Sequence, residues 1–147
     1  MKNVMILTGH GEYAKGIRSN LTFIAGENED LYAVDFLIDD TEETLKAKFK
    51  QILDETVGAN YVFICDLLGG TPFRCAAGLS QQQPGIEVVC GITTGSLMEA
   101  LFLKDTMSIE ELAQSLVNKS HESCVRFEMI NKVKTASDSL ESEQDGI

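Results

Sequence analysis

A single histidine with the chemistry of a nucleophile follows the first apolar run of the sequence. In VMILTGHGEYAKGI, His10 stands between Gly9 and Gly11. A neutral imidazole is a good nucleophile near neutral pH, because its pKa is about 6.5. It needs one ring nitrogen unprotonated, and a carboxylate bonded to the other nitrogen would fix that tautomer and stabilise the cation formed on attack. The alternative is a solvated or capping loop residue.

A second stretch, CDLLGGTPF, carries a carboxylate and a candidate anion site. Asp66 ends an apolar run, so it must lie near the mouth of a strand or be well hydrogen-bonded. Gly69 and Gly70 allow unusual backbone angles and the close approach of a ligand. Thr71 as N-cap and Pro72 at the first helical position would open a helix, whose N-terminus favours an anion such as phosphate. An ordinary strand–turn–helix would use the same residues.

Alternating strands and helices would bring these two stretches together. Continuous apolar runs predict buried strands, and apolar residues at helical spacing predict helices between them. Asp40 with Glu43, and Ser108 with Glu111, have the spacing of capping boxes. The expected strands are residues 4–7, 31–37, 61–68 and 86–92, and the expected helices are residues 13–25, 40–57, 71–82, a short one after Thr94 and one beginning at Ser108.

This pattern predicts one α/β domain with a mostly parallel sheet covered by helices on both faces. Chemistry in such sheets gathers at the carboxyl ends of the strands, near the point where strand order reverses. His10, Asp66 and the Gly69–Thr71 turn would meet there as a site for phosphorylating a histidine. We expect the domain to span residues 1–130 and an acidic, disordered tail to span 131–147. Residues 124–130, CVRFEMI, extend the last helix or form an edge strand.

Composition narrows the class of partner. The net charge of −11 argues against a nucleic-acid partner and is compatible with a basic protein. No run approaches the roughly 18 apolar residues of a membrane span, and the N-terminus lacks a signal-peptide cleavage site. The four cysteines form no C-x-x-C, and Cys65 and Cys90 lie inside apolar runs where a reduced thiol packs as a small hydrophobe, which indicates a reducing cytoplasm. His121, near the end of the last helix, is expected to be structural or solvated.

ILTGHGEYAKGI followed by FICDLLGGTPF resembles the enzyme IIA (EIIA) component of the mannose family of the phosphoenolpyruvate:sugar phosphotransferase system (PTS), over roughly residues 1–125. The resemblance implies that His10 accepts a phosphoryl group at Nε2 from the phosphocarrier protein HPr. A IIB component would receive it and phosphorylate a sugar brought in by the membrane IIC and IID components. Asp66 matches the position of the orienting carboxylate, and Thr71 that of a hydroxyl that is usually Ser.

The resemblance also implies one antiparallel edge strand and a homodimer. We expect a stand-alone IIA subunit, not one that is fused to IIB. A transfer between two histidines should need no metal ion, nucleotide or other cofactor, since backbone N–H groups can stabilise the phosphoryl charge. The sugar stays open among mannose, N-acetylgalactosamine, gluconate, sorbose and others, as does the identity of the IIB partner. An apolar excess predicts an interface core made of Leu97, Met98, Leu101, Phe102 and Met107; the alternative is that these residues cover the sheet of one monomer.

Other interpretations fit less well. Gly11 and Gly16 match part of a P-loop, but the required Lys and Ser/Thr are replaced by Ile17 and Arg18. A response-regulator receiver needs acidic residues directly after the first strand, where this chain has THG. Two alternatives stay open. They are the phosphoryl-donor subunit of a dihydroxyacetone kinase and a regulatory domain whose phosphohistidine only signals.

Overall fold

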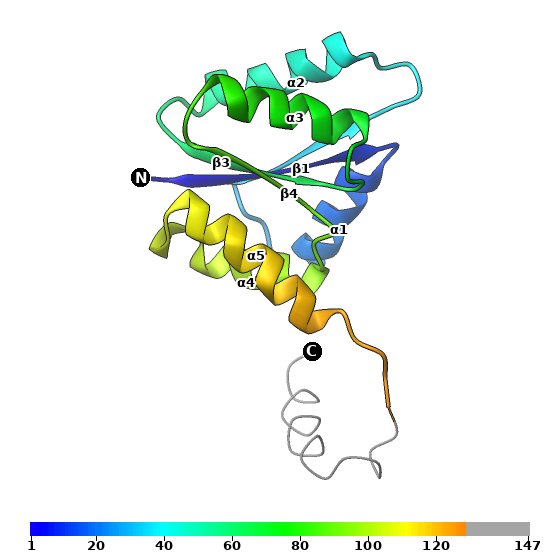
Figure 1. The fold of residues 1–147 in the computed structure, drawn as a ribbon, viewed down its shortest axis with the longest axis vertical. Helices are drawn as coiled ribbons and strands as arrows, with labels where there is room; N and C mark the ends of the chain where they lie inside the picture. Colours follow the sequence, from blue (N-terminus) through cyan, green and yellow to red (C-terminus); the bar gives the residue numbers. More distant parts are fainter. Residues whose placement is uncertain (129–147) are drawn as a thin grey trace.

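A computed structural model describes residues 1–128 as a four-stranded sheet with five helices and one short 3₁₀ turn. The elements follow the predicted order of alternating strands and helices (Figure 1). The strands are β1 (Asn3–His10), β2 (Leu31–Phe36), β3 (Asn60–Cys65) and β4 (Ile86–Cys90). The helical elements are α1 (Tyr13–Ala25), α2 (Glu42–Glu55), α3 (Thr71–Gln82), α4 (Thr94–Leu103), the turn η1 (Lys104–Thr106) and α5 (Ile109–Ser123).

All four strands are parallel, in the order β2-β1-β3-β4. The chain steps from β1 to β2 on one side and then crosses to β3 on the other, so strand order reverses between β1 and β3. The register pairs Thr8 with Cys65, which brings the carboxyl ends of these two strands together. The predicted parallel α/β sheet is confirmed. His10, at the end of β1, and Asp66, just after β3, lie at the point where strand order reverses.

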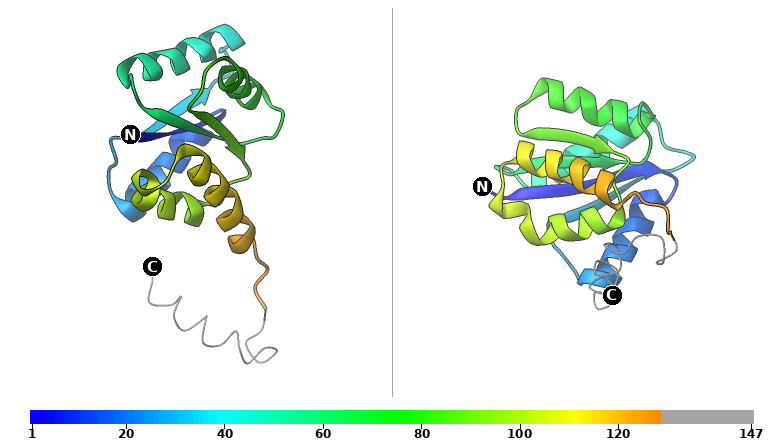
Figure 2. Two further views of the ribbon diagram at one scale, coloured as in Figure 1. Left: turned by 60° about the vertical axis from the view of Figure 1, so that its left-hand side comes forward. Right: turned by 60° about the horizontal axis from the view of Figure 1, so that its bottom comes forward.

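Helices cover both faces of the sheet. Figures 1 and 2 show α2 and α3 on one side, and α4 and α5 on the other. Alternation along β1 supplies both cores, since Met5 and Leu7 pack with α1, α4 and α5 while Val4 and Ile6 pack with α2 and α3. Both core faces are apolar along the full strand, which explains the continuous apolar runs.

One of the two predicted capping boxes is confirmed. Ser108 accepts from the Glu111 amide, and Glu111 accepts from the Ser108 amide. The box predicted for Asp40 and Glu43 is wrong, because Thr41 and Thr44 form it one residue later. Asp40 instead closes the preceding turn by accepting from the Leu37 amide, and it pairs with Lys48.

The antiparallel edge strand is not seen among residues 1–128, where every strand is parallel. Residues 124–128 are neither helix nor strand, and the rest of the candidate segment lies outside the described residues. So does the tail predicted for 131–147, and the domain boundary at 130 stays a prediction. Within the described part of the chain, no helix is long and apolar enough to cross a membrane.

The apolar residues assigned to an interface core lie mostly in the core of the molecule itself. Leu97 and Leu101 are buried, and Met98 and Met107 pack against the same cluster. Only Phe102 has its side chain largely in solvent, at 70% exposure. The apolar excess of this segment is therefore used within the subunit, and it no longer argues for a dimer.

Candidate functional site

His10 and Asp66 meet at the carboxyl edge of the sheet. His10 is the last residue of β1, and Asp66 directly follows β3. The Oδ2 atom of Asp66 accepts two hydrogen bonds from His10, one from its backbone N–H and one from ring Nδ1, both at 2.9 Å. The His10 side chain is 45% exposed and that of Asp66 is 17% exposed. The ring is thus fixed at one nitrogen and open to solvent.

This contact determines the tautomer of the ring. A carboxylate can only accept, so Nδ1 must carry the proton and the neutral ring keeps its lone pair on Nε2. Burial tends to raise the pKa of Asp66, but the hydrogen bonds from the His10 amide and ring outweigh it and leave that pKa below its usual value. Asp66 therefore remains a carboxylate near neutral pH, and Nε2 is the nitrogen available for attack.

Two glycines are required by the close packing around this pair. A Cβ on Gly70 would lie 2.9 Å from His10 Cε1 and 3.6 Å from Nε2. A Cβ on Gly9 would lie 2.5 Å from Tyr13 Cδ1 and 2.8 Å from Asp66 Cγ. Gly70 lets the start of α3 approach the nucleophilic edge of the ring, and Gly9 lets Asp66 lie against β1.

The predicted anion site lies beside the ring, with a different cap. Gly70, not Thr71, is the N-cap of α3, so Thr71 is the first helical residue and Pro72 the second. Gly69 has φ +79°, a left-handed conformation that glycine adopts without strain. The first N–H groups of a helix have no acceptor within it, so the start of α3 offers backbone donors to an anion next to Gly70. The Thr71 hydroxyl oxygen accepts from Arg74 at 3.3 Å, which leaves its O–H as a further donor.

Apolar side chains surround the exposed ring. The Phe36 ring at the end of β2 meets the His10 ring edge to face, with centroids 5.8 Å apart at 79°. Leu37 and Ile38 follow β2, and Leu67 and Leu68 follow β3. All four are exposed, from 45% for Leu37 to 98% for Ile38. Because β2 and β3 flank β1, these two apolar loops lie on either side of His10.

A family comparison agrees with this geometry. The family described as "PTS system fructose IIA component" matches residues 4–117. The chain belongs to the mannose-type EIIA family of the PTS. It is 31% identical to the fructose-specific EIIA component of Bacillus subtilis over 90% of this chain and 92% of that protein. It is 27% identical to the sorbose-specific EIIA component of Lacticaseibacillus casei over 80% and 86%.

Solved structures resemble this EIIA protein along its length. The mannose/sorbose-specific IIA subunit from Enterococcus faecalis has a TM-score of 0.80 at 27% identity, covering 88% of this chain and 97% of that one. The EIIA component from Streptococcus agalactiae has a TM-score of 0.76 at 28% identity, covering 85% and 97%. The family expected from the two sequence motifs is therefore confirmed.

This EIIA protein has a cation beside the predicted anion site, which the sequence analysis missed. The Arg74 guanidinium lies 3.3 Å from Thr71 Oγ1 and 3.5 Å from the Gly69 carbonyl oxygen, and 3.5 Å from Glu42 Oε1. Arg74 stands three residues after Thr71 in α3. That spacing places two helical residues on one face, so the sequence alone could have indicated that Arg74 lies close to Thr71.

The other polar candidates lie apart from this site in the EIIA fold. His121 is exposed in the last turn of α5, as its position in the sequence predicted. All four cysteines are free thiols, and burial raises the pKa of Cys65 to about 12, which suits a packed, unreactive side chain. Among residues 1–128, no group of three or more His, Cys, Asp or Glu side chains could hold a metal ion.

Proposed function

We propose that this EIIA protein carries a phosphoryl group on Nε2 of His10, received from phospho-HPr and passed to a IIB component that phosphorylates a sugar during uptake. One observation carries the proposal. Asp66 holds Nδ1 at 2.9 Å, which leaves the lone pair on Nε2, and this edge of the ring faces Gly70 at the start of α3. Gly69, Gly70 and Thr71 would bind the phosphoryl oxygens.

The step balances without a further reactant. The lone pair of Nε2 forms the new N–P bond while the N–P bond of the donor breaks, and that electron pair returns to the donor's ring nitrogen. The proton on Nδ1 stays with His10, bonded to Asp66, whose charge stabilises the cation growing on the ring. The N-terminus of α3 stabilises the phosphoryl oxygens, so we expect the step to need no metal ion or nucleotide.

The surface around His10 suits protein partners. The two apolar loops on either side of the ring, 37–38 and 67–68, offer contacts to HPr and then to IIB. The net charge of −11 favours a basic face on the donor. The relatives are named as fructose- and sorbose-specific components, which supports sugar uptake over the dihydroxyacetone-kinase and regulatory alternatives.

We also propose a homodimer in a reducing cytoplasm. The resemblance to the family implies the dimer, and four free thiols suit the compartment. Static light scattering at micromolar concentration measures the mass, and a monomer would contradict the dimer without affecting the proposed chemistry.

Radiolabelled phosphoenolpyruvate, enzyme I and HPr test the central proposal. We expect acid-labile label on the wild type and on His121→Ala, and none on His10→Ala. His121 is the matched control because it is the only other histidine in the sequence. Label that persists on His10→Ala, or a wild type that takes up no label, would contradict the proposed function.

A further inference from the structure

Arg74 is a cation at the start of α3 without a strong partner. Its side chain is 61% exposed, and its contacts with Gly69, Thr71 and Glu42 all measure 3.3–3.5 Å. A strong guanidinium–carboxylate pair is bidentate and has distances of about 2.7–2.9 Å. Its contact with Glu42 is a single long one, so the Arg74 guanidinium is held in place but can exchange partners at little cost.

The residues that Arg74 contacts flank the nucleophilic edge of His10. Gly70 lies against Cε1 and Nε2 of the ring, and Arg74 contacts the residue on each side of it, Gly69 and Thr71. Long side chains in a helix point back toward its N-terminus, which explains how a residue one turn into α3 reaches this turn. The guanidinium therefore lies beside the place where a phosphoryl group on Nε2 would be bound.

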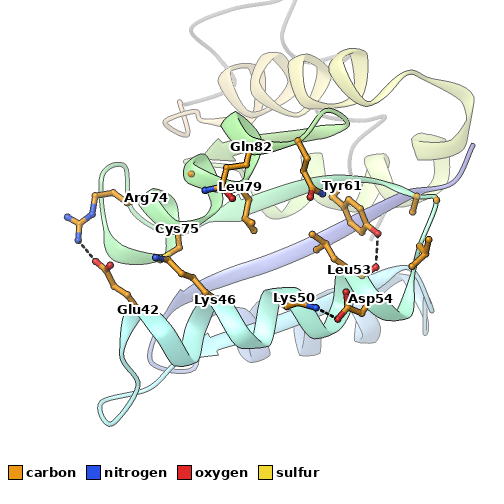
Figure 3. Close-up of a pocket in the computed structure, with 15 residues that line it drawn as sticks. Glu42, Lys46, Lys50, Leu53, Asp54, Tyr61, Arg74, Cys75, Leu79 and Gln82 are labelled. Carbon is orange, nitrogen blue, oxygen red and sulfur yellow. Dashed lines mark hydrogen bonds and ion pairs between the residues drawn. The ribbon is translucent and has the colours of Figure 1, made fainter.

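The groove between α2 and α3 separates Arg74 from the other nearby cations. Figure 3 shows Arg74 and Glu42 at one end of this groove, with Lys46 and Lys50 along α2. Lys50 pairs with Asp54, and Lys46 lies 4.0 Å from Glu43. Within residues 1–128, Arg74 alone among these three cations forms hydrogen bonds with the start of α3, which makes Lys46 a matched control for the removal of one positive charge.

We propose that Arg74 binds the phosphoryl group carried on His10, exchanging its long contact with Glu42 for phosphoryl oxygens. The inference rests on the proposed function. A phosphoryl group adds negative charge beside Asp66 in a protein of net charge −11, and the backbone N–H groups of α3 contribute only partial charges. The planar fork of a guanidinium matches phosphoryl oxygens in geometry and supplies a full positive charge.

The phosphorylation equilibrium distinguishes this role from partner docking. A residue that only contacts HPr changes the forward and reverse rates equally and leaves the equilibrium between phospho-HPr and phospho-EIIA unchanged. A residue that binds the phosphoryl group stabilises phospho-EIIA. For one exposed, charge-assisted contact, we expect Arg74→Gln to shift the equilibrium about 3- to 10-fold toward phospho-HPr. Arg74→Lys, which keeps the charge without the fork, should fall between.

The experiment mixes HPr and each EIIA variant with a limiting amount of phosphoryl label and measures the distribution at equilibrium. Lys46→Gln should match wild type within about twofold, since Lys46 is a more distant charge screened by solvent. Glu42→Gln frees Arg74 and should leave the equilibrium unchanged or shift it toward phospho-EIIA. If Arg74 only clamps α3 to α2, Glu42→Gln would instead act in the same direction as Arg74→Gln.

A second measurement reports the contact directly. The ³¹P resonance of phospho-His10 should shift in Arg74→Gln and stay in place in Lys46→Gln, with both variants folded by circular dichroism. An unchanged equilibrium in Arg74→Gln would overturn the inference, even if transfer were slower, because it would assign Arg74 to docking. If the wild type is labelled normally, an unchanged equilibrium overturns only the role of Arg74. If the wild type takes up no label, both the proposed function and the role of Arg74 fail.

Discussion

Replacement of Asp66 by Asn tests how the carboxylate acts on His10. Oδ2 of Asp66 accepts both the backbone N–H and the ring N–H of His10. Its other oxygen, Oδ1, is buried and has no hydrogen-bond partner among the described residues. An amide must put its oxygen in one of these positions and its NH₂ group in the other. Each orientation therefore has its own cost.

With the amide oxygen at the Oδ2 position, both hydrogen bonds survive but lose their charge. A hydrogen bond to a charged group contributes roughly 1.5–3 kcal/mol, and a neutral one about 1 kcal/mol. We expect transfer to slow about 2- to 30-fold, because a difference of about 1.4 kcal/mol corresponds to a factor of ten. The NH₂ group is then buried without an acceptor, which costs about 1–3 kcal/mol of stability.

With the NH₂ group at the Oδ2 position, the amide donors face the His10 backbone N–H, which is also a donor. The NH₂ group would then donate to ring Nδ1, so the ring proton would move to Nε2, the wrong tautomer for attack. Loss of the orienting carboxylate in the serine-protease triad costs about 10⁴-fold, which sets an upper limit. Phosphoryl transfer has a loose transition state in which little of the bond to the nucleophile has formed, so the rate of transfer should fall by less than that limit.

Quench-flow transfer from phospho-HPr measures the rate, with a melting curve for each variant. Asp105→Asn is the matched control, since Asp105 also accepts a backbone N–H, from Asn3, but at the opposite end of β1. It should lower stability without slowing transfer. A folded Asp66→Asn protein that transfers as fast as wild type would remove Asp66 from the site and refute the tautomer reasoning.

Acid should narrow the stability difference between wild type and Asp66→Asn. The fold holds the pKa of Asp66 below its usual value, so its carboxylate stabilises the native state above the unfolded pKa of about 3.9. That contribution disappears as pH falls through the lower pKa of the folded state. Urea unfolding at neutral pH and below about pH 4 should show the difference shrinking; a constant difference would contradict the assigned hydrogen bonds to the Asp66 carboxylate.

Two further predictions concern packing. Gly70→Ala should slow transfer about 10-fold, because its Cβ would lie 2.9 Å from His10 Cε1 and displace the ring. Gly78→Ala has open space at its Cβ and should leave the transfer rate measured by quench-flow unchanged. Equal rates in both variants would contradict the close approach of Gly70 to the ring. Lys104→Met should cost about 1–3 kcal/mol in urea unfolding, since Asp30 and Asp105 lose a charged hydrogen-bond donor but Asp30 keeps Lys2 and Asp105 is half exposed, while the transfer rate per folded molecule stays the same.

The position of the site was predictable because it depends on topology. An apolar run that ends in a polar residue places that residue at a strand end, and parallel strands gather those ends at one edge. His10 and Asp66 needed only β1 and β3 to be neighbours, which the reversal of strand order supplies. Their chemical roles, by contrast, remain predictions until the variants are measured.

The helix starts were harder to predict because capping depends on backbone angles. Thr71 is a good N-cap residue by type, but Gly70 has the extended backbone that an N-cap requires, at φ −70° and ψ 170°. The same holds at α2, where Thr41 is extended and caps the helix in place of Asp40. Neighbouring residues that both suit a cap differ only in conformation, and the sequence does not state which one is extended.

Four of the five residues assigned to an interface core pack within the subunit, which is the alternative that the sequence left open. Leu97 and Leu101 join the cluster that α1, α5 and the sheet share. A helix that is apolar on most sides is typical of a buried element, and the same pattern is typical of a partner surface. Composition cannot tell a neighbour within the chain from a neighbour in a second copy.

Arg74 illustrates what the combination of sequence and structure adds to a family resemblance. Backbone groups at Gly69 and Gly70 and the carboxylate of Asp66 define where a phosphoryl group would be held, but they provide partial or negative charges. Arg74 is the side chain that would add a full positive charge there, since it contacts the residues on either side of Gly70. The geometry of the site thus rests on strand ends and glycines, whereas the proposed role of Arg74 is to shift the balance between donor and acceptor by about 3- to 10-fold.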